Sequence, residues 1–355
     1  MMMTKGQRIL FFSTISIVGI FFLLWGLFKS QVFLIPFTTA IILALLMIPF
    51  SNFLENKFMN RASASLSSTL VLFLISLGFM ALVSFQVKNF MDDWDQIKQT
   101  MKPKVEQLKE LVMEHTPVQE EQLDLSKTDQ NIPFTGKNTN PEQKAGNFFG
   151  ATMSFLGDYL LTFIYIFFLL NYRHRFKEFF LRLFSVDKKQ EVTDVINKSA
   201  RVAQKYLIGK LLLIAILAGL YAIGLGISGV NNFIIISALA ALFSLIPYLG
   251  NIIGFGMAMA FGFLTTGETG VLVGIIITFV IAQFVESYIL EPYVVGDQVD
   301  LHPFFVILAV VIGNQVWGIM GMILAIPILA IVNVVFRHVQ VLHPFGYLLS
   351  KKDLN

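Results

Sequence analysis

The chain has 355 residues, of which 55% are hydrophobic and 14% charged, with a formal net charge of +3 and a mean hydropathy of +0.71. An average soluble domain carries about 25% charged residues, so this balance excludes an ordinary soluble enzyme and indicates that lipid is the main solvent of the chain. Because the chain contains no cysteine, it cannot form disulfides, a thiolate nucleophile or a Cys-ligated metal site.

Five stretches in the first two thirds of the chain are long and apolar enough to cross a bilayer. A spanning helix needs about 20 mostly apolar residues, because the hydrocarbon core is about 30 Å thick and each residue rises 1.5 Å. The predicted spans are 9–28, 32–50, 66–87, 148–170 and 206–228. The first is too long for a signal peptide and lacks a small-residue cleavage site, so we expect it to be retained.

A sixth span is predicted at 270–290, between two longer apolar stretches at 231–264 and 301–336. As one straight helix, each longer stretch would reach about 50 Å, well beyond the hydrocarbon thickness. Their interruptions are Pro247, Tyr248, Leu249 and Gly250 in the first, and Gly313, Asn314, Gln315 and Gly318 in the second. We therefore predict an all-α integral membrane protein with about six full transmembrane helices plus two broken segments. The broken segments are expected to be re-entrant hairpins, and eight single spans are the alternative.

The charges of the loops predict the orientation of the chain. Residues 88–147 contain 8 lysines and 11 acidic residues, whereas residues 171–210 contain 10 Lys and Arg and 4 acidic residues. The positive-inside rule places the second loop in the cytoplasm and the first outside, with both termini cytoplasmic. Two re-entrant hairpins would put the loop around Asp297 inside, and eight spans would put it outside.

The polar regions divide the chain further. In the external region 88–147, apolar residues at spacings of three and four predict one amphipathic helix, which a flexible linker at 117–147 follows. The segment 171–205 mixes basic and aromatic residues and is expected to lie in the lipid headgroup layer; no nucleic-acid-binding motif accompanies it. The remaining divisions are 1–87 for the first three spans, 148–170 for the fourth, 206–336 for a transport core and 337–355 for a cytoplasmic tail.

Motifs for enzymatic chemistry are weak in this chain. Gly226-Ile227-Ser228-Gly229 matches the Gly-x-Ser-Gly of rhomboid-type proteases, but His302, the only histidine near a later span, precedes a proline at a segment border. A protease is therefore a remote hypothesis, and we expect no enzymatic activity. The chain has neither His-Glu-x-x-His nor Gly-x-x-x-x-Gly-Lys, so we expect no metal site, no cofactor and no nucleotide hydrolysis.

The acidic residues of the last third are the stronger functional signal. Residues 211–336 contain no Lys or Arg but hold Glu268, Glu286, Glu291, Asp297 and Asp300. A set of charges with one sign in a lipid-embedded region suits protons or small cations. Glu286 lies near the end of the sixth span with Gln283 on the same helical face, and Asp158 lies within the fourth span. Burial of an unpaired carboxylate is costly, so both acids are functional hypotheses.

The last third of the chain contains a series of dispersed positions that form a recognisable pattern. They are Pro247-Tyr248-Leu249-Gly250, Gln283, Glu286, Pro292, Gly296, His302-Pro303, Gly313, Gly318, Gly321 and Pro327. Together with Tyr206-Leu207-Ile208-Gly209-Lys210, at the start of the fifth span, this pattern resembles the signature of the autoinducer-2 exporter family of bacterial membrane proteins. The resemblance implies a polytopic inner-membrane protein, a homo-oligomer that moves small molecules or ions without ATP.

Composition and resemblance together predict a transporter that exports a small polar signalling molecule such as autoinducer-2. A sodium- or lithium-proton antiporter is the alternative, and a non-transporting membrane sensor is a third hypothesis. The expected transport path contains Glu286, Gln283, Tyr248, Asn251, Asn314, Gln315, Asp158 and Glu291. The expected breaks in the helices are Pro247, Gly250, Pro292, Gly296, Pro303, Gly313, Gly318, Gly321 and Pro327. The expected partners are the bilayer, further copies of the chain, and a small-molecule or cation substrate with possible proton coupling.

Overall fold

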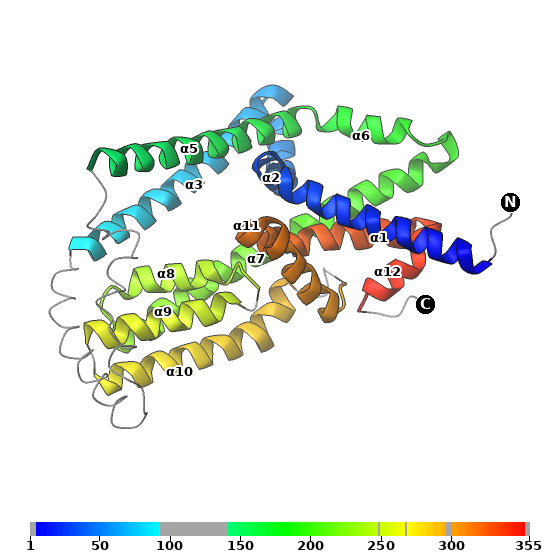
Figure 1. Ribbon diagram of the computed structural model, residues 1–355. Coiled ribbons are helices and arrows are strands. Elements are labelled where there is room, and N and C mark those ends of the chain that lie inside the picture. The colour runs from blue at the N-terminus through cyan, green and yellow to red at the C-terminus, as the bar shows by residue number, and fades with distance from the viewer. Residues whose placement is uncertain (1–4, 93–140, 248, 267, 296–299, 352–355) are drawn as a thin grey trace.

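The structure is a computed structural model that describes residues 5–92, 141–247, 249–266, 268–295 and 300–351, and the regular elements of these residues are all helices (Figure 1). In lipid, backbone N–H and C=O groups have to be paired within the chain, which favours helices throughout. The first half contains α1 (Lys5–Lys29), α2 (Gln31–Lys57), α3 (Arg61–Asp92), α5 (Pro141–Asn171) and α6 (Arg173–Arg182). The second half contains η3 (Val186–Lys188), α7 (Lys189–Ile227), α8 (Phe233–Phe243), α9 (Leu249–Thr265), α10 (Thr269–Val285), the π-helix η4 (Glu286–Val295), α11 (Pro303–His338), η6 (Gln340–Leu342) and α12 (His343–Leu349).

Six helical stretches of the described residues are long and apolar enough to cross a membrane, which confirms the all-α membrane class. They are Phe11–Lys29, Gln31–Lys57, Arg61–Ala81, Val186–Ile227, Thr269–Val294 and Pro303–His338. The described apolar part of α5, Leu156–Asn171, is shorter. The fifth predicted span is longer than expected, because the basic residues before position 206 continue the helix of α7 back to Lys189. The segment 171–205 therefore consists of α6, η3 and the first part of α7.

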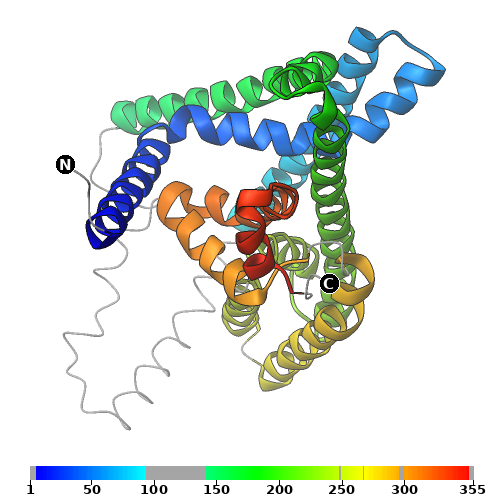
Figure 2. The same ribbon diagram turned by 90° about the vertical axis from the view of Figure 1, so that its right-hand side faces the viewer.

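Helices α2, α3 and α5 form an N-terminal block that lies above α8, α9 and α10 in both ribbon views (Figures 1 and 2). Its core is a cluster of small and large apolar side chains, namely Ala40, Ala44, Met47, Phe163, Ile166 and Leu170. Helix α7 connects this block to the rest of the molecule, and the side-chain amide of Gln204 donates to the carbonyl of Leu45 at 2.8 Å. Helix α2 continues unbroken through Pro36 and Pro49.

Helices α7, α8, α9 and α10 form a C-terminal block with its own apolar core. Leu217, Tyr221, Ile236, Ala258 and Ile275 belong to this core and are almost completely buried. Small residues allow the helices to approach closely, as small-residue ridges do in membrane proteins. A Cβ atom at Gly254 would press on Ala240 of α8, and one at Gly262 would overlap Ile275 of α10.

The first predicted break forms a tight helical hairpin from α8 and α9, which we call hairpin 1. Helix α8 ends at Phe243 and α9 begins at Leu249, with Pro247 in the turn between them. The two helices are antiparallel, because Gly250 lies against Phe243 while Gly254 lies against Ala240. A Cβ atom at position 250 would overlap the carbonyl group of Phe243, so only glycine permits this approach.

The second predicted break divides α11 into two antiparallel halves, 303–316 and 319–338, which we call hairpin 2. The chain reverses at Trp317 and at Gly318, whose φ of 58° and ψ of −138° suit glycine. Gly313 and Gly321 then face each other so closely that a Cβ atom on either would overlap the carbonyl of the other. Pro303 is at the first position of the helix, where proline is well tolerated. The expectation of a break at Pro327 is wrong, because the helix continues through this buried residue.

The two hairpins open toward opposite ends of α7, and the turn of hairpin 1 packs against the arms of hairpin 2. Ile246 in the turn of hairpin 1 packs with Val310, Met322 and Ala325 of hairpin 2. Hairpin 1 opens beside the C-terminal end of α7, whereas hairpin 2 opens where His338 Nε2 lies 3.0 Å from Lys198 Nζ. Residues 198 and 227 are about 44 Å apart along a straight helix, so the openings are separated by more than a hydrocarbon core.

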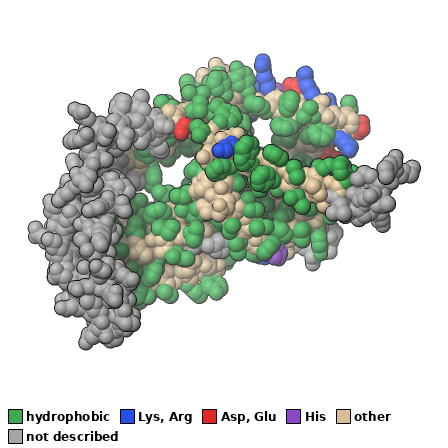
Figure 3. All heavy atoms as spheres, in the orientation of Figure 1, with side chains coloured by type: hydrophobic (Ala, Val, Ile, Leu, Met, Phe, Trp, Pro, Cys, Tyr) green, Lys and Arg blue, Asp and Glu red, His purple; other side chains and the backbone are tan. Residues whose placement is uncertain are grey.

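We call the end of the molecule that carries Arg173, Lys198 and Arg337 the basic end. Most of the visible Lys and Arg atoms lie over and near α6 at this end, while apolar atoms cover much of the rest of the described surface (Figure 3). Asp297 lies outside the described residues, but Asp300 pairs with Arg337 at the basic end, as expected for two hairpins rather than eight spans. The external amphipathic helix predicted from Trp94 onward also lies outside the described residues. The side of the membrane that the basic end faces stays a prediction.

Candidate transport site

A cluster of polar side chains lies beside the turn of hairpin 1. The amide nitrogen of Asn251, in the first turn of α9, donates to Gln283 Oε1 at 2.7 Å and to Glu286 Oε2 at 2.8 Å. Gln283 Nε2 lies 3.5 Å from the same carboxylate oxygen and 3.1 Å from Ser287 Oγ. Glu286 has only 7% of its surface exposed. The structure therefore brings together three of the residues that the sequence predicted for the transport path.

Glu286 occupies an unusual position for an acid in an apolar protein. Asn251 holds Glu286 at the N-terminal end of α9, where unpaired backbone N–H groups and the helix dipole favour negative charge. The Oδ1 atom of Asn251 is buried and has no hydrogen-bond partner. This oxygen and the buried carboxylate of Glu286 lie on neighbouring side chains. Together they lack a positive charge or a further donor proton.

Helix α10 changes to a π-helix at Glu286. π-helices are rare and occur mostly at functional sites. Glu286 is buried, whereas Glu291, five residues later in the same π-helix, is exposed. Pro292, which the sequence identified as a break, lies within this π-helix.

Lys210 lies on α7, the helix that packs against the π-helix of Glu286, and the sequence did not predict a functional role for it. Its side chain is half-buried. Two buried tyrosines, Tyr206 and Tyr221, lie on the same helix. The available signal was that Lys210 is the last basic residue before 126 residues without Lys or Arg.

Other predicted path residues lie apart from this cluster. Asp158 is exposed on α5, which packs against α2, α3 and α6 of the described helices, so it cannot act together with Glu286. Asn314 and Gln315 are exposed and still helical, since the reversal of hairpin 2 comes at Trp317. Tyr248 and Gly296 lie outside the described residues.

Polar groups also close the open end of hairpin 2. Asp300 Oδ2 accepts from Arg337 at 2.9 Å, and its Oδ1 accepts from the backbone N–H of Lys351 at 3.0 Å. Asn333 donates to the backbone carbonyl of Asp300 at 2.8 Å. The backbone N–H of His302 donates to Leu349 at 2.7 Å. These bonds fix α12 to both halves of hairpin 2.

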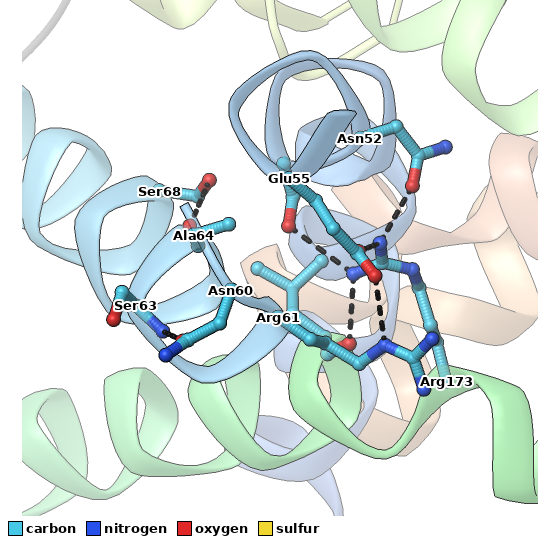
Figure 4. A network of polar contacts seen from close by, with 10 residues as sticks. Asn52, Glu55, Asn60, Arg61, Ser63, Ala64, Ser68 and Arg173 are labelled. Carbon is cyan, nitrogen blue, oxygen red and sulfur yellow. Dashed lines mark hydrogen bonds and ion pairs between the residues drawn. The ribbon is translucent and has the colours of Figure 1, made fainter. Parts of the chain in front are cut away.

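A second network of charges lies at the basic end of the N-terminal block (Figure 4). Glu55 at the end of α2 accepts from Arg61 at 3.0 Å and also pairs with Arg173. Arg173 donates further to Asn52 at 2.7 Å. The network fixes the start of α6 to the end of α2 and the end of α2 to the start of α3, and we assign it a structural role.

The predicted serine and histidine of a protease are not brought together. Ser228 Oγ donates to the Gly224 carbonyl at 2.7 Å and lies against Gly274, at the opening of hairpin 1. His302 Nδ1 accepts from Phe304 N–H at 3.3 Å, at the opening of hairpin 2. Among the described residues, no group of three or more His, Asp or Glu side chains could hold a metal ion.

Comparison with known proteins shows the family of the chain. The model of the family described as "AI-2E family transporter" matches residues 10–340. "Putative transport protein MT0215" of Mycobacterium tuberculosis (strain CDC 1551 / Oshkosh) is 26% identical over 91% of this chain and 88% of its own length. "Putative transport protein YrrI" of Bacillus subtilis (strain 168) is 35% identical over 38% of this chain and 37% of its own length. "Putative transport protein YueF" of the same strain is 28% identical over 49% of this chain and 47% of its own length.

The chain thus spans about half or less of the length of these two Bacillus subtilis relatives, while the family model covers almost all of it. Two broken helical hairpins and a buried carboxylate are the features expected of a membrane transport site. The chain is a multi-pass membrane protein and belongs to the AI-2E family of transporters.

Proposed function

We propose that this protein exports a small polar molecule of the autoinducer-2 type without ATP, through a path between the turns of hairpins 1 and 2. The observation that supports this most directly is the buried carboxylate of Glu286, which Asn251 binds next to the turn of hairpin 1, where Ile246 packs against hairpin 2. Helix ends and unwound backbone at such a point offer N–H and C=O groups that replace water around a polar solute. The family name and the relatives support transport in general.

In the proposed mechanism, access to the site alternates as the two hairpins separate in turn. Each hairpin is open at a different end of α7, so movement of hairpin 1 would expose Glu286 to one side and movement of hairpin 2 to the other. Asn251 connects the carboxylate of Glu286 to hairpin 1 by a 2.8 Å hydrogen bond. Movement of that hairpin therefore changes the surroundings of the acid, which is the coupling that a secondary transporter requires.

A flux assay tests this proposal. The full chain is reconstituted in liposomes, and the release of autoinducer-2 is measured with the wild type and with Glu286→Gln. We expect release by the wild type and a loss of at least tenfold in the variant, because the amide cannot exchange a proton or pair with a cation. Asp158→Asn is the matched control and should transport like the wild type, since Asp158 is exposed and outside the cluster. Equal rates in empty and protein-containing liposomes would contradict the proposal.

The composition of the cluster favours one second hypothesis, a sodium- or lithium-proton antiporter. Asn251, Gln283 and Glu286 offer oxygen atoms, which are the ligands that alkali cations prefer. In liposomes with an imposed sodium gradient, an antiporter would change the internal pH, and Glu286→Gln would abolish that change. An unchanged internal pH would exclude this second function.

A further inference from the structure

Helix α6 has three different faces, although it is only 10 residues long. Residues four apart lie on the same side of a helix, and the half-buried positions of α6 are Arg173, Lys177 and Leu181. Because α6 packs mainly against α5 and α7, these positions mark its packed face. The rest of the helix surface is exposed, so α6 is held along one side.

The second face of α6 is apolar, and the described residues leave it uncovered. Its side chains recur at spacings of three and four, which place them in one stripe along the helix. The stripe consists of Phe176, Phe179, Phe180 and Leu183, which are between 47% and 61% exposed. Phe184 and Val186, which follow directly, are exposed as well. A contiguous stripe of large exposed apolar side chains indicates an interaction surface.

The third face of α6 is polar. It carries the exposed side chains of His174, Arg175, Glu178 and Arg182. Helix α6 also begins two residues after the end of apolar α5. An apolar stripe beside a polar one, next to a membrane-embedded segment, is typical of a helix that lies in the interface between the acyl chains and water.

The charge beside the apolar stripe is positive. Residues 173–189 contain six Lys and Arg and two acidic residues. Arg173 and Arg182 are engaged in ion pairs. Of the described residues in this segment, the exposed cations outside any ion pair within 4.0 Å are Arg175, Lys188 and Lys189. An excess of exposed positive charge next to a membrane attracts anionic lipid headgroups.

Basic side chains lie over aromatic rings at the same end of the molecule. The guanidinium carbon of Arg175 lies 5.5 Å from the ring centre of Tyr172, and Lys57 Nζ lies 5.5 Å from that of Phe53. The ion pair of Arg173 attaches α6 to the end of α2, which carries Lys57. Long basic side chains beside aromatic rings are typical of the headgroup layer, where the apolar part of each side chain meets lipid and its charge meets water.

We propose that α6 lies in the headgroup layer of an anionic leaflet at the basic end, with its apolar stripe toward the acyl chains and Arg175, Lys188 and Lys189 bound to lipid phosphates. A second copy of the chain fits this face less well, because two positively charged surfaces would meet. Helix α6 packs against α7, and α7 packs against both hairpins. Anionic lipid would thus fix one end of the helix that contacts both hairpins, whatever solute the protein transports.

Spin labelling tests which face of α6 meets lipid. Phe179→Cys on the apolar stripe and His174→Cys on the polar face are made separately in the cysteine-free full chain. Each is labelled with a nitroxide in liposomes of phosphatidylcholine and phosphatidylglycerol. Oxygen enriches among the acyl chains and a nickel chelate stays in water, so we expect the ratio of oxygen to nickel collisions to be at least about threefold higher at position 179.

Two results of this labelling would overturn the inference. One is an equal collision ratio at positions 174 and 179, which would mean that the apolar stripe faces water. The other is a label at position 179 that neither reagent reaches, since protein rather than lipid would then cover the stripe.

Lipid composition tests the role of the charges. Hydrogen exchange of the α6 backbone is compared in nanodiscs of phosphatidylcholine alone and of phosphatidylcholine with about one fifth phosphatidylglycerol. We expect the anionic lipid to slow exchange in the wild type at least about threefold, and high salt to reduce this effect. Equal exchange in the two lipids would overturn the anionic part of the inference.

A matched pair of variants separates the charges of α6 from charge in general. Arg175→Gln with Lys188→Gln should reduce the response to phosphatidylglycerol to less than about half of the wild-type response. Arg201→Gln with Lys351→Gln removes the same charge from exposed positions outside α6 and should keep the full response. Equal losses in both double variants would contradict a lipid site on α6. These measurements use no transported solute, so their outcome is distinct from a failure of the flux assay.

Discussion

Hairpin 1 and hairpin 2 are similar in construction but different in chemistry. Each reverses within a few residues, and each is closed by glycines that lie against the facing backbone. The turn of hairpin 1 carries Asn251, which holds a buried acid. At the turn of hairpin 2, the indole of Trp317 donates to the carbonyl of Leu27 at 3.0 Å, and the charges of this hairpin lie at its open end.

This difference shows how one structural device can serve two purposes. Hairpin 1 places the N-terminal end of α9 and the amide of Asn251 beside buried Glu286, so the proposed function assigns the chemistry of transport to this hairpin. Hairpin 2 is attached to α1 at its turn and to α12 at its open end, so its polar contacts mainly hold the helices together. Changes in the first should affect transport more than stability, and changes in the second should affect stability more than transport.

The largest expected effect comes from the glycines that close the hairpins. Gly250→Ala and Gly321→Ala should each destabilise the fold by about 3 kcal/mol or more, because the new Cβ would overlap a backbone carbonyl. Gly256→Ala is the matched control within α9, since nothing lies within 4 Å of that position. Thermal unfolding of the purified variants measures the effect. If the Gly321→Ala variant were as stable as the control, the close approach of the two halves of hairpin 2 would not matter for stability, and the comparison would fail for this hairpin.

The second effect concerns transport rather than stability. Asn251→Ala removes the hydrogen bond to Glu286 and should lower the initial flux roughly tenfold, with unfolding close to that of the wild type. Asn314→Ala and Gln315→Ala near the turn of hairpin 2 should lower it less than about threefold, because both side chains are exposed. Equal losses from both hairpins would show that the site extends over the two turns.

The open end of hairpin 2 should show a smaller effect on stability. Asp300→Asn removes an ion pair that is partly exposed, so the expected loss is about 1 kcal/mol and it should shrink at high salt. Hydrogen exchange of α12 measures this locally, since Asp300 also binds the backbone of Lys351. Glu268→Gln is the counterpart at the opening of hairpin 1, where the side chain caps nothing, and should change exchange little.

The turn of hairpin 2 should respond least among these sites. Trp317→Phe loses one hydrogen bond to α1 and keeps an aromatic ring, so we expect a loss of about 1 kcal/mol or less and nearly normal flux. A large loss of transport would show that the attachment to α1 belongs to the mechanism.

The ion pair between Glu178 and Arg182 lies outside both hairpins and should have no measurable effect on stability. The hydrogen bond and charge of Arg182 lower the pKa of the Glu178 carboxyl, so this pair contributes above the ordinary pKa of the acid and is lost as pH falls through the lowered pKa. Both side chains are exposed, so Glu178→Gln should leave the thermal midpoint unchanged from mildly acidic to neutral pH. A clear shift would mean that α6 is more important to the fold than its exposure suggests.

The sequence predicted the membrane class and the positions of both breaks, because apolar length, Gly and Pro are local signals, and it singled out Glu286, which the structure buries. It did not predict that α7 packs against the π-helix, since this depends on contacts between segments that are far apart in the chain. The π-helix was equally hidden, because Pro292 predicts a disturbance but not its form. Asp158 illustrates the reverse case, where an acid within an apolar stretch is merely exposed.

The opposite openings of the two hairpins are the central claim, and thiol labelling tests them most directly. Glu268→Cys at the opening of hairpin 1 and Gln340→Cys at that of hairpin 2 are made separately in this cysteine-free chain. Both positions are exposed, and a membrane-impermeant reagent is applied to intact cells and to inverted vesicles. We predict labelling of position 268 in cells and of position 340 in inverted vesicles. Labelling of both positions from the same side would contradict the account.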